Sequence, residues 1–117
     1  VLHRIRQPFN VNTIAQAMAC VAINDHEHIH RSIELNSQQY KFLFYELSKL
    51  GLECIPSVGN FITFTGNFIG KEMFNNLMEK GVIVRSVDLY GMKDFLRVTI
   101  GTESENLKFL SALEELL

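Results

Sequence analysis

The sequence lacks the features that mark a membrane segment, a nucleotide site or a metal centre. No apolar run approaches the roughly 20 residues that cross a bilayer, and no glycine-rich phosphate loop or Ser-His-Asp arrangement stands out. The two cysteines, Cys20 and Cys54, are far apart and form no C-x-x-C pair. We expect both to be reduced thiols buried in apolar surroundings, with a disulfide as the weaker alternative.

The sequence also lacks a large excess of positive or negative charge. The formal net charge is -2, which argues against a nucleic-acid partner because such a surface needs a basic face. With no bilayer-length segment, these absences predict a cytoplasmic protein with neither a membrane nor a nucleic-acid partner.

At 117 residues and 47% hydrophobic content, the chain is expected to form one domain, 1–117, that opens with an extended lead-in, 1–12. It begins with Val1 and has no initiator methionine. We therefore expect a piece of a longer polypeptide, with a trimmed small protein as the alternative.

Four segments are expected to be helical. Thr13 with Gln16 has the spacing of a capping box at the start of the first, which extends to about Ile23. The break at 24–25 provides a fresh N-cap for a long amphipathic helix that Gly51 ends. The third spans 70–80, and the fourth follows a second capping box at 102–105. Its apolar stripe is expected to contain Leu107, Leu110, Leu113 and Leu117.

Strands are predicted over 52–55, 60–65, 82–87 and 95–100, separated by turn residues. Together these elements predict an α+β fold in which a small, mostly antiparallel sheet is covered by helices.

Arg85 and Arg97 are the most informative residues. Each lies within a short β-branched run, Val82-Ile-Val-Arg85 and Leu96-Arg97-Val-Thr-Ile-Gly101, where an arginine is costly unless an anion meets it. Two such arginines on adjacent strands suggest a site for a doubly anionic small molecule. The alternative is structural pairing with Asp88, Asp94 or Glu103.

Other polar clusters favour ordinary roles. His26 and His30 share a helical face with spacing that suits a metal, but no third ligand is evident nearby, so we expect surface histidines. Arg4, Arg6 and Gln7 fit a lead-in, an interface or part of a site equally well. The turn that contains Ser57 is expected to be only a turn.

Four segments taken together resemble the C-terminal part of histidinol-phosphate aminotransferases, which are fold-type I, pyridoxal-phosphate enzymes. The resemblance covers essentially the whole chain and keeps the family's order and spacing. The segments are Arg6-Gln-Pro-Phe-Asn-Val-Asn12, Ser57-Val-Gly-Asn-Phe-Ile62, Gly81-Val-Ile-Val-Arg85 and Leu96-Arg-Val-Thr-Ile-Gly-Thr102.

This resemblance implies roles for the two arginines. Arg97 resembles the arginine that binds the α-carboxylate of the amino-acid partner, and Arg85 resembles the one that helps to bind the phosphate of histidinol phosphate. Glutamate and 2-oxoglutarate are the implied partners in the other half-reaction, and a homodimer is the implied assembly. We expect the full-length protein to be an aminotransferase of histidine biosynthesis.

The chain departs from the family in one decisive respect. No lysine stands in the motif that forms the Schiff base with pyridoxal phosphate, a motif that lies upstream in the family. We therefore assign no catalytic or cofactor-binding residue here and expect the chain alone to be inactive. A smaller departure is Ser86, where related sequences often carry proline.

Three alternatives stay open. The parent could be another class II aminotransferase, such as one for aromatic amino acids. The chain could be a free-standing domain that binds an anionic metabolite through the same arginines. It could also be an interaction module, for which the first helix offers Ile14, Met18 and Val21. We expect exposed apolar surface on the isolated chain, and self-association as its result.

Overall fold

The structure, a computed structural model, describes residues 9–117. The cluster of Arg4, Arg6 and Gln7 and most of the expected lead-in therefore lie outside the described residues. The chain separates into two compact units, a first that ends at Ser32 and a second, Ile33–Leu117. Among residues 9–117, the buried hydrophobic residues all lie in the second unit.

In the first unit, α2 spans Thr13–Ala22 and α3 begins at His26. The expected cap at Thr13 is wrong by one residue. Asn12 is the N-cap, and its Oδ1 accepts a hydrogen bond from the Ala15 backbone N at 2.8 Å. Asparagine is at least as good a cap as threonine. The fresh cap before α3 is confirmed, because Asp25 Oδ1 accepts from His28 N at 3.0 Å.

No residue of α2 is buried. Ile14, Met18 and Val21 are between 67% and 74% exposed, so the expected exposed apolar surface is confirmed on this helix. The expectation of two buried cysteines is wrong for Cys20, which is exposed. An apolar sequence context did not bury it, since the helix that carries it has no buried face.

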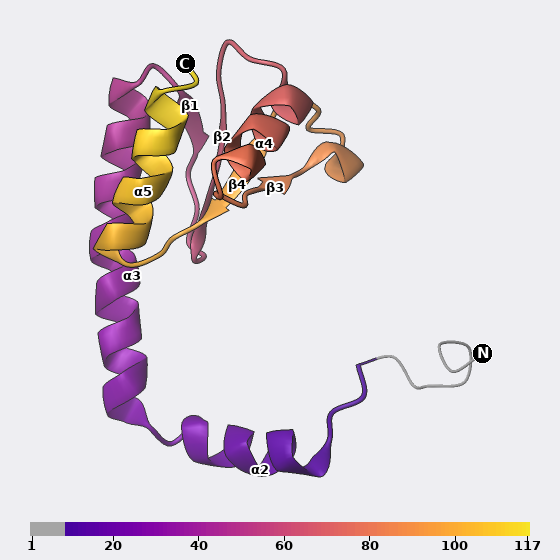
Figure 1. The fold of residues 1–117 in the computed structure, drawn as a ribbon. Helices are drawn as coiled ribbons and strands as arrows, with labels where there is room; N and C mark the ends of the chain where they lie inside the picture. Colours follow the sequence, from indigo (N-terminus) through magenta and orange to yellow (C-terminus); the bar gives the residue numbers. More distant parts are fainter. Residues whose placement is uncertain (1–8) are drawn as a thin grey trace, which may run out of the picture. The chain divides into compact units, whose positions relative to one another are not determined.

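The second unit contains the sheet and its helices (Figure 1). In chain order its elements are the rest of α3 (His26–Lys49), β1 (Glu53–Ile55), β2 (Phe61–Thr65), α4 (Gly70–Glu79), β3 (Arg85–Ser86), the short 3-10 helix η1 (Asp88–Tyr90), β4 (Leu96–Thr99) and α5 (Glu103–Glu114). The expected strand at 82–87 is wrong in length, because only its last part pairs with β4.

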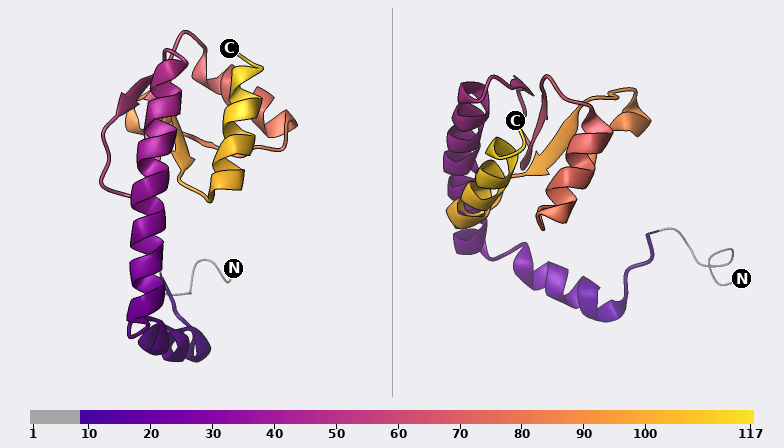
Figure 2. Two further views of the ribbon diagram at one scale, coloured as in Figure 1. Left: turned by 90° about the vertical axis from the view of Figure 1, so that its left-hand side faces the viewer. Right: turned by 45° about the horizontal axis from the view of Figure 1, so that its top comes forward.

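The sheet has the strand order β1-β2-β4-β3, and every pairing is antiparallel. Helix α4 connects β2 to β3, which flank β4. Figure 2 shows from two further directions that α5 lies beside α3 and that α4 lies along the part of the sheet that ends in β3. The predicted α+β fold with a small antiparallel sheet and helical cover is therefore confirmed.

Glycine ends two helices of this unit. Gly51 and Gly81 have φ values of +77° and +74°, which glycine adopts without steric cost. The residue after each glycine closes a hydrogen bond to the last turn, Leu52 N to Leu47 O at 3.1 Å and Val82 N to Leu77 O at 2.9 Å. These are Schellman ends, and the predicted stop at Gly51 is confirmed.

The core lies on one face of the sheet. Residues alternate along each strand, so Ile62 and Phe64 of β2 and Leu96 and Val98 of β4 point to the helices and are buried. The helical side of this cluster consists of Leu43, Leu47, Met73, Leu77, Phe109, Leu110, Ala112 and Leu113.

The expected stripe of α5 is right in part. Leu110 and Leu113 are buried, whereas Leu107 and Leu117 are about half exposed, at 50% and 55%. Phe109 takes the core position instead. The capping box before α5 is confirmed by reciprocal contacts between Thr102 and Glu105.

None of the helices in the part of the chain that the structure describes combines the length and hydropathy needed to cross a bilayer.

Candidate functional site

Arg85 and Arg97 lie directly opposite each other on β3 and β4. The register continues across the sheet, because Arg97 is paired with Thr63 of β2 and Thr63 with Ile55 of β1. Residues paired in this way point to the same side of an antiparallel sheet. The two arginines therefore share the face opposite the core, which we call the open face. The prediction that they lie on adjacent strands is confirmed.

The two side chains differ in their surroundings. Arg85 is exposed, whereas Arg97 is partly buried. The Cζ atom of Arg97 lies 4.7 Å from the centroid of the Phe61 ring. The premise that apolar strands enclose both arginines is wrong, because the flanking Val84, Leu96 and Val98 turn to the core and leave the arginines on the open face.

The structural alternative, pairing with a nearby acid, is not seen. Within residues 9–117, no salt bridge includes either arginine, and the three that form involve Arg31, Lys49 and Lys80. Asp94 has another role, since its Oδ1 accepts a hydrogen bond from Gly70 N at 3.2 Å. Like charges directly opposite each other destabilise a sheet, so an anion between these two guanidinium groups would remove a repulsion.

The loop between the two arginines is fixed at its far end. The Thr65 hydroxyl donates to Asp94 O at 2.8 Å. A Cβ on Gly70 would lie 2.9 Å from Lys93 O, so this close approach requires glycine. The tip of the loop is free of such contacts, with Leu89 96% and Tyr90 66% exposed. An exposed tip on an anchored loop suits a segment that could fold over a ligand.

The turn before β2 is bound to α3. The Tyr40 hydroxyl oxygen accepts from Ser57 N at 3.3 Å, and Asn36 Nδ2 donates to Gly59 O at 3.4 Å. Ser57 Oγ accepts from Gly59 N at 3.0 Å within the turn itself. This segment, part of the family resemblance, holds the start of β2 and therefore Phe61 in place.

Sequence reasoning missed Asn106, which is 2% exposed in α5. Its Oδ1 accepts from Gly101 N at 3.1 Å, and its Nδ2 donates to Gly101 O at 3.1 Å and to Gln39 Oε1 at 2.8 Å. It thereby fixes the end of β4, the strand of Arg97. The available signal was an asparagine directly after a capping box, three and four positions before the apolar Phe109 and Leu110.

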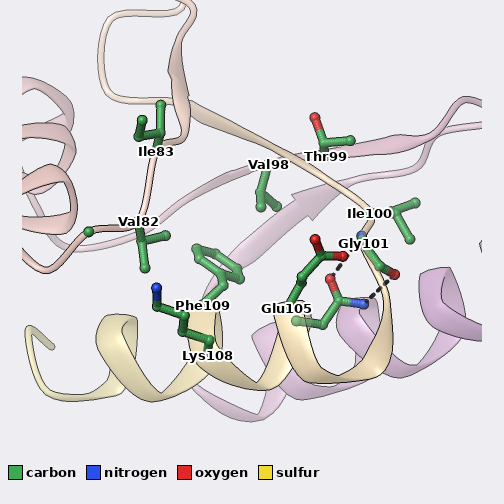
Figure 3. A pocket seen from close by; sticks show the side chains of 11 residues that line it. Val82, Ile83, Val98, Thr99, Ile100, Gly101, Glu105, Lys108 and Phe109 are labelled. Atoms are coloured by element: carbon green, nitrogen blue, oxygen red, sulfur yellow. Dashed lines mark hydrogen bonds between the residues drawn. The ribbon is translucent and has the colours of Figure 1, made fainter.

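A hollow of about 470 Å³ lies next to this asparagine, between the end of β4 and α5. Figure 3 shows the side chains that line it. Val82, Val98, Ile100 and Phe109 give it apolar walls, and Lys108 lies at its edge. Neither arginine lines it, so the hollow and the arginine pair are separate features of the second unit.

The histidines and cysteines do not form a reactive centre in the described part of the chain. His26, His28 and His30 are exposed, as expected, and no three His, Cys, Asp or Glu side chains among residues 9–117 come together as metal ligands. Burial raises the pKa of the Cys54 thiol to about 11, so the reactive thiolate form is scarce at neutral pH.

Comparison with known proteins gives this geometry a context. The chain belongs to the class I and II aminotransferases, whose family pattern matches residues 1–113. Within that family it is 44% identical over 116 residues to the histidinol-phosphate aminotransferase of Moorella thermoacetica, a match that covers 99% of this chain and 30% of that protein. The chain thus spans about a third of the length of such relatives.

Solved structures agree with the fold. The histidinol-phosphate aminotransferase of Clostridium acetobutylicum superposes with a TM-score of 0.83 at 26% identity, over 98% of this chain and 36% of that one. The Sinorhizobium meliloti histidinol-phosphate aminotransferase, solved with pyridoxal-5'-phosphate, has a TM-score of 0.80 at 17% identity, over 99% and 34% of the two chains. The fold is that of an aminotransferase fold-type I domain.

The described residues do not by themselves suit pyridoxal phosphate. Such a site needs a lysine for the Schiff base, and each of the six lysines, all of which lie within residues 9–117, is exposed on the surface. Lys49 and Lys80 form salt bridges with Glu46 and Glu115 at 2.9 Å and 2.6 Å. What the open face offers is paired guanidinium groups, which suit anion binding rather than covalent cofactor chemistry.

Proposed function

We propose that this chain is the substrate-binding part of a pyridoxal-phosphate-dependent aminotransferase of histidine biosynthesis. In this proposal the full-length enzyme transfers an amino group between histidinol phosphate and 2-oxoglutarate, with glutamate as the other partner. Membership of the aminotransferase family and the names of its relatives support the reaction class. The observation that carries the proposal is the placement of Arg85 opposite Arg97 on the open face.

The two arginines take different parts in this proposal. Arg97 binds the α-carboxylate of glutamate and the corresponding end of the other substrate, and Arg85 helps to bind the phosphate of histidinol phosphate. A planar guanidinium can hold either anion through two parallel N–H donors. Two such anchors orient the reacting carbon over the cofactor, which lowers the entropic cost of the reaction.

The remaining functions belong, in this proposal, to the two-thirds of the relatives' length that this chain does not span. That part holds pyridoxal phosphate, which supplies the electron sink that transamination needs, so the chain alone is inactive. We also propose a cytoplasmic enzyme that works as a homodimer.

The test is a chimera in which this chain replaces the matching segment of the Moorella thermoacetica relative. Arg97→Ala should lower kcat/KM for both partners, because both use this anchor. Arg85→Ala should lower it mainly for histidinol phosphate. Loss of one partner of a desolvated charge pair costs about 2 kcal/mol or more, which is roughly a 30-fold fall in kcat/KM.

Arg31→Ala is the matched control, since Arg31 is an exposed arginine that pairs with Glu27 on α3, and it should leave both reactions unchanged. Equal losses for the two substrates in Arg85→Ala would contradict the division of roles. A chimera that uses an aromatic amino acid but ignores histidinol phosphate would remove the phosphate role of Arg85 and keep the aminotransferase class.

A further inference from the structure

The contact between Phe61 and Arg97 carries a further inference. The guanidinium carbon lies 4.7 Å from the ring centroid, well within the distance of about 6 Å at which a cation–π attraction acts. We propose that Phe61 is a positioning residue for Arg97: its ring fixes the plane of the guanidinium so that the N–H edge is presented to the substrate carboxylate. This inference rests on the proposed function of Arg97.

Strand geometry places the two side chains together. Arg97 is paired with Thr63, and Phe61 is two positions before Thr63 on the same face of β2. A diagonal neighbour of this kind is within reach of an aromatic side chain. The start of β2 is held by its own ladder, since Ile100 N donates to Asn60 O at 2.8 Å. The ring is therefore carried by a fixed strand rather than by a loop.

The chemistry of a guanidinium makes the contact compatible with ligand binding. It carries five N–H donors in one plane, and its carbon lies over the Phe61 ring. A carboxylate needs two parallel donors, so the contact with Phe61 leaves enough of them for the ligand. It also limits the freedom of a long side chain before the ligand arrives, which reduces the ordering cost of binding.

Arg85 has no comparable support. The cation–π contacts in the described part of the chain are those of Arg97 with Phe61 and of Lys49 with Tyr45, and Arg85 is exposed. Loss of the Phe61 ring should therefore weaken the carboxylate anchor while leaving the Arg85 contact with phosphate in place.

Phe61→Leu and Phe61→Tyr in the chimera test this role. Leucine keeps an apolar side chain but removes the ring, so KM for 2-oxoglutarate should rise about three- to tenfold, the range that follows from the usual strength of a cation–π contact. The value of kcat should change little. Tyrosine keeps the ring and should keep KM near that of the parent.

Phe42→Leu is the matched control. Phe42 is also partly buried, but it packs against the core from α3, so its loss should lower stability without raising KM. A rise in KM of the same size in Phe42→Leu would show that general loosening explains the effect. An unchanged KM in Phe61→Leu, beside a raised KM in Arg97→Ala, would overturn the proposal.

A second measurement separates this inference from the proposed function. In NMR spectra of the 117-residue chain, the ring should shift the Nε–Hε signal of Arg97 upfield, and Phe61→Leu should abolish the shift. No shift in the parent chain overturns the positioning role whatever the kinetics show. A clear shift together with normal KM in Arg97→Ala would instead refute the proposed function, and the positioning role would fall with it.

Discussion

Phe61 and Phe64 are three positions apart on β2, so they lie on opposite faces of the sheet. Phe64 is fully buried, and its ring centroid lies 5.9 Å from that of Phe109 and 6.3 Å from that of Phe68. Phe61 is partly buried and covers Arg97. One strand thus contributes the same residue type to the core and to the candidate site.

The two faces contribute to two different free energies, that of unfolding and that of ligand binding. On the core face, stability comes from apolar area removed from water and from close packing. On the open face, two positive charges stand opposite each other without an acidic partner in residues 9–117, an arrangement that adds little to stability. Substitutions on the two faces should therefore differ in whether they change unfolding or binding.

The largest expected effect is on the core face. Phe64→Ala should lower the free energy of unfolding by about 3–5 kcal/mol, because it removes a fully buried ring and leaves a cavity. Urea denaturation followed by circular dichroism measures the loss. Phe61→Ala on the same strand is the comparison and should lose distinctly less. Equal losses would mean that the open face is packed as tightly as the core.

A smaller loss is expected at Asn106, whose hydrogen bonds link α5 to the end of β4 and to α3. Asn106→Leu keeps most of the side-chain volume but leaves Gly101 N, Gly101 O and Gln39 without a partner. An unsatisfied buried group costs about 1–3 kcal/mol. Gly101 and Gln39 are only partly buried, so water can replace part of what they lose, and the total loss should be about 1–3 kcal/mol. In the double variant with Gln39→Leu the losses should be less than additive. Strict additivity would show that the Asn106–Gln39 hydrogen bond adds nothing.

The cap of α5 should matter less again. Thr102→Ala removes the hydroxyl that accepts from the Glu105 backbone N–H and donates to the Glu105 carboxylate at 2.7 Å. It should lower stability by about 1 kcal/mol, a usual value for a helix cap. Urea unfolding at neutral pH measures this loss. Ser111→Ala, at an exposed position of the same helix away from its N-terminus, serves as the control, and a loss there as large as in Thr102→Ala would argue against the cap.

The same cap predicts a pH dependence. Hydrogen bonds from the backbone and side chain of Thr102 lower the pKa of Glu105 from its ordinary 4.5. The stabilisation from this carboxylate is complete above that ordinary value and is lost as the pH falls through the lowered folded-state pKa. Thr102→Ala should weaken this acid dependence. An unchanged pH profile would mean that the backbone N–H of Thr102 alone accounts for the lowered pKa.

These contrasts also show what could be predicted from the sequence. The periodicity of the long strands and helices, the capping box and the glycine stops are local, and they were predicted within a few residues. The face on which an arginine lies depends on which of its neighbours turn to the core. The β-branched flanks therefore predicted the strands correctly, but the prediction that Arg85 is enclosed by them was wrong. The length of β3 was overestimated, because the apolar residues 82–84 before it do not pair with β4.

Long-range partners were beyond sequence reasoning. The Phe61–Arg97 contact requires the β2–β4 register, and the Asn106–Gln39 hydrogen bond joins residues 67 positions apart. In both cases the residues next to each partner in the sequence do not indicate which distant residue it contacts. The exposure of Cys20 was missed for the opposite reason, since an apolar sequence context cannot tell whether a helix has anything to pack against.

The smallest effect on stability is expected on the open face itself. Arg85→Gln removes one of two like charges that lie directly opposite each other, at an exposed position. The free energy of unfolding should change by no more than about 0.5 kcal/mol, and in the stabilising direction because a repulsion is removed. Urea unfolding at low and high salt measures this, and the gain should shrink at high salt, which screens exposed charges. A large loss of stability, insensitive to salt, would instead show that Arg85 supports the fold, and the contrast between the two faces would no longer hold at this strand.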